Sequence, residues 1–169
     1  MLAVQNKQAE PITQSSQRYM VVGDLMKMLV TRAESNDQFI IAETFIRPAG
    51  GMPLLHTHPS SETFYVLEGS FAIFRQNAEG QKIRSVLNAG EVAHIPGNAP
   101  HGFTNIGKNQ GKLLIVLEGK SMMDEFFAEI GIPVEDETQL PAPAGSPDMA
   151  HILDVSKRYG IKFLEAPPG

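Results

Sequence analysis

Two of the five histidines stand two residues apart in an apolar stretch, and a carboxylate follows them closely. His56 and His58 fall in an expected β-strand, where side chains two residues apart point to the same face, so both imidazoles can reach one ion. Glu62 opens the next expected strand, and His101 begins another one after a turn. Three imidazole nitrogens and one carboxylate oxygen suit a divalent ion such as Zn, Fe, Mn, Ni, Co or Cu.

Glycine, proline and asparagine surround these candidate ligands at fixed spacings. Residues 50–69 read G-x(5)-H-x-H-x(3)-E-x(6)-G, and residues 90–105 read G-x(5)-P-x-N-x(2)-H-x(3)-N. These patterns resemble the two signature motifs of the cupin superfamily, with one departure: Asn98 stands where the second motif normally has glycine. Asparagine is enriched in the left-handed backbone region, so we expect the turn before His101 to keep its shape.

The resemblance implies an all-β fold, the double-stranded β-helix or jelly-roll barrel of the cupins, with a metal near one mouth. The chain looks most like the small single-domain microbial cupins of the quercetinase-like group. The metal ligands carried over from the motifs are His56, His58, Glu62 and His101, with one divalent transition metal as the cofactor. Glu62 is also the expected catalytic residue, which either stays on the metal or leaves it to take a proton.

The elements that must position these residues follow from alternating apolar and polar residues between Gly, Pro, Asn and Asp turns. This pattern predicts short antiparallel strands with no helix between them, which favours a barrel or a sandwich. Ten strands are expected, at residues 19–22, 25–32, 38–47, 54–58, 62–67, 70–76, 82–87, 91–95, 101–105 and 113–117.

The sequence changes character after the expected barrel. Apolar residues recur at helical spacing over residues 122–130, with Ser121 as the expected N-cap and Gly131 at the end. This helix should pack its Met and Phe face on the outside or the mouth of the sheet. Residues 133–147 should form an extended surface arm, and residues 149–159 a second helix. The expected division is an N-terminal arm at 1–17, a cupin barrel at 18–119, and C-terminal helices with an extended tail at 120–169.

Residues on the strand faces of the candidate ligands are expected around the site. Phe64, Val66 and Phe103 share those faces, so they should be pocket walls or core. His94 is not one of the motif residues. It either contacts the substrate or the metal ligands, or it is an exposed histidine. His151 should lie on the surface. An apolar pocket without clustered Lys or Arg favours a hydrophobic or aromatic chelating substrate over a phosphorylated sugar.

Two classes of function fit this site. The first is a metal-dependent enzyme acting on a small chelating organic molecule, as a dioxygenase that cleaves a ring or a C–C bond; an isomerase or a lyase would use the same ligands. The second is a cupin that binds a small molecule without turnover. The fold by itself does not choose between them, because the superfamily is functionally mixed.

Composition narrows the partners and the location. The chain has 169 residues, no cysteine and a net charge of −5, which excludes thiolate sites and argues against nucleic acid as a partner. No apolar run reaches the roughly 20 residues of a membrane helix, and no secretory segment is visible, so a cytoplasmic location is expected. The strands before Gly50 exceed one barrel motif, so we expect a homodimer through them.

Overall fold

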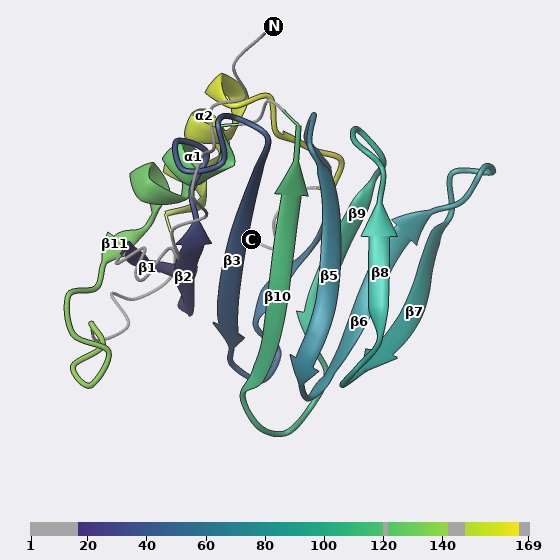
Figure 1. Ribbon diagram of the computed structural model, residues 1–169. Coiled ribbons are helices and arrows are strands. Elements are labelled where there is room, and N and C mark those ends of the chain that lie inside the picture. The colour runs from purple at the N-terminus through teal and green to yellow at the C-terminus, as the bar shows by residue number, and fades with distance from the viewer. Residues whose placement is uncertain (1–16, 120–121, 142–147, 166–169) are drawn as a thin grey trace, which may run out of the picture.

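Two antiparallel sheets face each other in the computed structural model, which describes residues 17–119, 122–141 and 148–165 (Figure 1). The larger sheet has the spatial order β11 (Ile132–Pro133), β1 (Arg18–Val21), β2 (Asp24–Val30), β3 (Phe39–Ile46), β10 (Gly111–Glu118), β5 (Ser61–Glu68) and β8 (Val92–Ile95). The smaller sheet has the order β12 (Lys162–Phe163), β4 (Gly51–Thr57), β9 (His101–Asn105), β6 (Ser70–Gln76) and β7 (Lys82–Asn88). This is the jelly-roll, or double-stranded β-helix, that the sequence predicts.

All ten expected strands are present, because their alternation of apolar and polar residues matches one buried face. In β3 the side chains of Ile40, Ala42, Thr44 and Ile46 are buried, and those between them are more exposed. Each inward face meets the inward face of the other sheet, so the core lies between the sheets.

The centre of that core is fully closed to solvent. Phe64 and Val66 from the larger sheet and Phe71 from the smaller one are 0 % exposed and belong to one apolar cluster. Burial of apolar surface contributes about 25 cal/mol per Å², so these large side chains hold the two sheets together.

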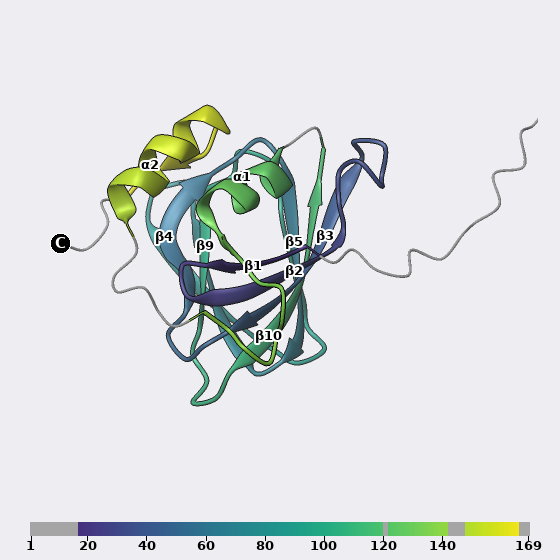
Figure 2. The ribbon, with the colours of Figure 1, turned by 90° about the vertical axis from the view of Figure 1, so that its left-hand side faces the viewer.

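Two short helices follow the barrel strands. In α1 (Met123–Ile130) the buried side chains are Met123 and Phe126, and in α2 (Met149–Arg158) Asp148 caps the first turn by accepting a hydrogen bond from the His151 N–H. Figure 2 shows α1 in front of the opening between the sheets, with α2 beside it. The expected cap of α1, Ser121, lies outside the described residues.

The C-terminal part also supplies two strands that the sequence did not predict. β11 pairs with β1, and the Val134 N–H donates to the Arg18 carbonyl at 2.9 Å, so the segment expected to be a surface arm begins as a sheet edge. β12 pairs with β4 at the other sheet. Among the helices that the structure describes, none combines the length and the apolar character needed to cross a bilayer.

Candidate metal centre

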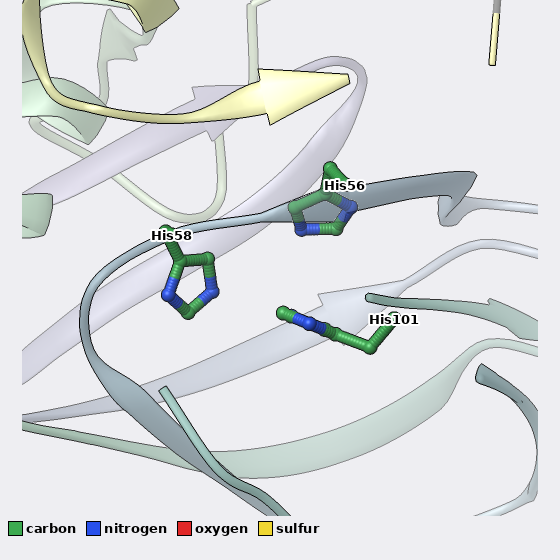
Figure 3. Close-up of side chains that lie close together, drawn as sticks. All are labelled: His56, His58 and His101. Atoms are coloured by element: carbon green, nitrogen blue, oxygen red, sulfur yellow. The ribbon is translucent and has the colours of Figure 1, made fainter. Parts of the chain in front are cut away.

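Three histidines from two neighbouring strands and the loop that follows one of them converge between the sheets (Figure 3). His56 on β4 lies opposite His101 on β9, and their ring centroids are 4.5 Å apart. His58 follows β4 directly, and its ring centroid lies 4.8 Å from that of His101. Ligand-capable nitrogen atoms of the three rings lie within 4.8 Å of one another, so these histidines could hold one metal ion.

Main-chain carbonyl groups orient all three rings. Each Nδ1 atom lies within hydrogen-bond distance of a carbonyl oxygen: His56 with Leu54 at 2.9 Å, His58 with Ser60 at 3.0 Å, and His101 with Ala99 at 2.8 Å. A carbonyl oxygen can only accept, so each Nδ1 carries the proton and each Nε2 is left for a partner at the centre. Such outer hydrogen bonds are what fix the tautomer of metal-ligating histidines.

The carboxylate of Glu62 completes the cluster from the other sheet. Its Oε2 atom lies 2.8 Å from Nε2 of His101 and 3.2 Å from Nε2 of His58. Donor atoms about 2.1 Å from one ion and at right angles to each other are about 3 Å apart, so this spacing matches a shared coordination sphere. All four side chains are buried. The donor set therefore fits the divalent metal implied by the sequence motifs.

The electrostatics of the cluster favour a cation. Burial raises the pKa of Glu62, but the hydrogen bonds from His101 and His58 outweigh it and hold the pKa at about 2. Burial lowers the pKa of His56 to about 4, and the charge of His101 adds to this shift. Burial also lowers the pKa of His101, but its contact with Glu62 outweighs this and raises the pKa overall. At neutral pH the cluster thus presents an ionised carboxylate and a neutral His56.

Turns that contain residues in the left-handed backbone region position the strands and loops of the candidate ligands. Gly69 and Gly90 both have φ of 88°, and Asn98 has φ of 62°, so asparagine keeps the backbone shape that glycine has in the motif. The Asn98 N–H donates to the His58 carbonyl at 2.8 Å. This bond links the turn that precedes His101 to the segment that carries His58.

A cavity of about 100 Å³ opens beside the histidines, between the sheets. Its walls are mostly apolar. The lining residues are Val21, Val22, Asp24, Leu25, Met26, Thr44, Ile46, Gly51, Met52, His56, His58, Glu62, Phe103, Ile115, Met123, Phe126, Phe127, Ile130, Ile152, Ile161 and Phe163.

The residues that the sequence placed around the pocket lie in three different positions in the structure: on the cavity wall, in the core and on the exposed face of the sheet. Phe103 lines the cavity, whereas Phe64 and Val66 lie in the core behind it, which is the other position expected for them. His94 lies on the exposed face of β8 and outside the lining, where its Nδ1 is 2.9 Å from Thr63 Oγ1. Of the two positions expected for His94, the structure shows the exposed one, outside the lining of the cavity.

Other lining residues carried no functional signal in the sequence. Met123 and Phe126 of α1 lie at the cavity mouth, in agreement with one position expected for that helix. Phe163 of β12 and Thr44 of β3 also line the cavity. Phe163 comes from a tail without a recognisable pattern, and Thr44 is one residue of an alternating strand, so only the pairing of distant strands identifies them.

Comparison with protein families gives the class of the chain. Residues 44–117 match the model of the cupin domain. This match includes His56, His58, Glu62 and His101. Together with the jelly-roll fold, it shows that the chain contains a cupin domain. No curated protein sequence matches the chain significantly.

Solved structures share the fold at low sequence identity. An RmlC-like cupin from Shewanella frigidimarina is 21% identical with a TM-score of 0.53, over 69% of this chain and 96% of that one. A variant of Bacillus subtilis oxalate decarboxylase is 15% identical with a TM-score of 0.56, over 92% of this chain and 41% of that one. Drosophila melanogaster CENP-C bound to CAL1 is 15% identical with a TM-score of 0.51, over 60% and 80%. At such identities the likeness concerns the fold alone.

Proposed function

We propose that this cupin binds one divalent transition metal through His56, His58, His101 and Glu62, and that a small chelating organic molecule binds at the positions left open. The observation that carries the proposal is the convergence of the three histidine rings, with the Nε2 atoms of His58 and His101 on the Glu62 carboxylate and every Nδ1 atom held by a carbonyl. A metal bound there would polarise an oxygen atom of the chelating molecule.

The reaction we propose is oxidative cleavage of an enolic substrate by dioxygen. Incorporation of both oxygen atoms draws its four electrons from the substrate, so no external reductant is required. Glu62 lies on the cavity wall and contacts two of the histidines, so after leaving the metal its carboxylate can take the enolic proton while the substrate oxygen is bound. An isomerase or a lyase would use Glu62 in the same way, without consuming oxygen.

Metal analysis tests the first part of the proposal. Protein purified without added metal should contain about one equivalent of a transition metal by inductively coupled plasma mass spectrometry. His56→Ala and His101→Ala should lose it, because each removes a nitrogen donor. His94→Ala is the matched control and should retain it, since His94 is exposed and outside the cavity. Full metal content in both site variants would refute the assignment.

Turnover assays test the second part. The protein should be reconstituted with Fe, Mn, Ni, Co, Cu or Zn, because this donor set accepts several ions. Manganese deserves inclusion since the Bacillus subtilis oxalate decarboxylase of similar fold is described with Mn(II) centres. Oxygen uptake with flavonols or other enolic chelators would support a dioxygenase. Conversion without oxygen uptake would indicate an isomerase or a lyase, and tight binding with no conversion in any metal form would indicate a binding protein.

A further inference from the structure

The cavity beside the metal centre contains negative charge and no positive side chain. Among the described residues that line it, none is lysine or arginine, and the carboxylates are those of Asp24 and Glu62. Asp24 is already engaged, since it accepts hydrogen bonds from the Arg47 N–H at 3.0 Å and the Gly51 N–H at 2.8 Å. The Arg47 guanidinium is half exposed and bonds to the Val22 carbonyl and to Asp24, so it is committed to the turn.

A dianionic ligand would find no positively charged side chain among the described lining residues to compensate its charge. Burying a charged group costs several kcal/mol unless an opposite charge and hydrogen bonds compensate. A divalent ion bound at the proposed site would already be partly neutralised by Glu62, and the remaining walls are mainly methionine, isoleucine and phenylalanine side chains. The walls therefore favour a ligand that is apolar apart from the oxygen atoms that chelate the metal.

Among the described lining residues, one side-chain hydroxyl stands in the apolar wall, on the sheet that faces the strands of the histidines. Thr44 lies on β3 of the larger sheet, whereas His56 and His101 lie on strands of the smaller sheet. Thr44 is 4 % exposed and lines the cavity, and its Oγ1 lies 3.5 Å from the Leu113 carbonyl oxygen, at the limit of a hydrogen bond. A buried hydroxyl with so weak a partner gains from a stronger one.

We infer that the ligand is an apolar chelator with at most one negative charge, which gives its chelating oxygens to the metal and a further hydroxyl or carbonyl group to Thr44. Thr44 is thus a specificity-determining residue, because it forms a hydrogen bond with the polar group at the end of the ligand away from the metal. This inference rests on the proposed function. It also separates the chain from its structural neighbours named for oxalate, because oxalate is a dianion with no apolar part.

The Co(II)-loaded protein allows the inference to be tested by binding. Tropolone, an apolar enolic chelator, and oxalate, a dianionic chelator, are titrated by calorimetry while the visible spectrum of Co(II) reports their entry into its coordination sphere. Tropolone should bind at least tenfold more tightly than oxalate. Equal or tighter binding of oxalate would overturn the inference.

Substitution of Thr44 tests the second contact. A set of hydroxytropolones, each with one added ring hydroxyl, identifies the isomer that gains affinity over tropolone. Thr44→Val should weaken that isomer about five- to tenfold and change tropolone less than twofold, whereas Thr44→Ser should retain the gain. Thr44→Ala provides a second variant without the hydroxyl if Thr44→Val unfolds. The role of Thr44 is refuted if no isomer gains affinity, or if the variants weaken both probes equally.

The two levels of failure are distinguishable. If no Co(II) spectrum forms in the wild-type protein, the proposed metal site fails and the ligand inference falls with it. If Co(II) binds stoichiometrically but oxalate is preferred, the metal site stands and only the inferred ligand class is wrong.

Discussion

The ring of Phe163 packs against the ring of the candidate ligand His56, with centroids 5.7 Å apart. The two residues are directly paired between β12 and β4. The Leu164 N–H donates to the Leu55 carbonyl at 2.8 Å, and the Leu55 N–H donates to Glu165 Oε2 at 2.8 Å. A two-residue strand near the C-terminus thus supports the strand that carries the candidate ligand His56 and closes one side of the cavity.

Loss of the Phe163 ring should weaken both the fold and the site. Phe163→Ala removes apolar contacts with the core and should lower the free energy of unfolding by about 1–3 kcal/mol. It also opens the cavity beside His56, so a chelator in solution should remove the metal several-fold faster. Urea denaturation and the rate of metal transfer to a chromogenic chelator measure the two effects.

The neighbouring residue provides the control for this prediction. Leu164 is 50 % exposed and does not line the cavity, and its main-chain bond to Leu55 survives substitution. Leu164→Ala should change neither quantity appreciably. If Phe163→Ala transfers its metal at the wild-type rate, Phe163 does not shield the site.

Stability of the metal-free protein should depend on pH through Glu62 and His101. The pKa of Glu62 is lowered from 4.5 to about 2, so its contribution is complete above about pH 4.5 and is lost as the pH falls towards 2. The pKa of His101 is raised above 6.5, so its contribution is complete below about pH 6.5 and is lost as the pH rises through the raised value. The contact between them should therefore stabilise the fold most between about pH 4.5 and 6.5.

Urea unfolding in the presence of EDTA checks this window. The difference in stability between wild type and Glu62→Gln should be largest between about pH 4.5 and 6.5 and should shrink on both sides. A difference independent of pH would contradict the ion pair. The metal affinity should instead fall below about pH 6, because protons compete with the metal for the imidazole nitrogens.

The left-handed backbone conformation at Asn98 explains why asparagine can replace glycine in the turn before His101, and substitution of Asn98 tests this explanation. Asn98 has φ of 62° and an exposed side chain, so backbone conformation dominates its contribution. Asn98→Gly should leave the melting temperature and metal content nearly unchanged. Asn98→Val should cost about 1–2 kcal/mol, because a β-branched residue fits the left-handed region poorly. Equal melting temperatures for both variants would show that the turn changes shape instead.

A homodimer through the N-terminal strands remains our prediction for the assembly. Leu29 on β2 and Phe39 on β3 are 38 % and 36 % exposed, and the edge strand β1 is already paired with β11, so contact through the outer sheet face is expected. Light scattering at micromolar concentration should give twice the 18.4 kDa mass of the chain. Leu29→Glu should yield a monomer, whereas Val92→Glu, at the far end of the sheet, should not. A monomeric wild type would refute the prediction.

The residues by themselves determined the barrel strands and the four candidate ligands. Alternation along β3 and the turn glycines Gly69 and Gly90 act over a few residues, so their effect is readable in the chain. The motifs placed His56 and His101 as partners although 45 positions separate them. Alternation also put His94 and Val92 on one face, but it could not tell which face is exposed.

Only the tertiary structure decided how the site is closed and what its walls are. β11 and β12 contain two residues each, so no periodicity can reveal them, and they exist through hydrogen bonds to β1 and β4. Thr44 and Phe163 become neighbours of the same cavity because strands far apart in the chain are brought face to face. Such contacts depend on the registry of distant segments, which is set by packing of the whole core and not by any local pattern.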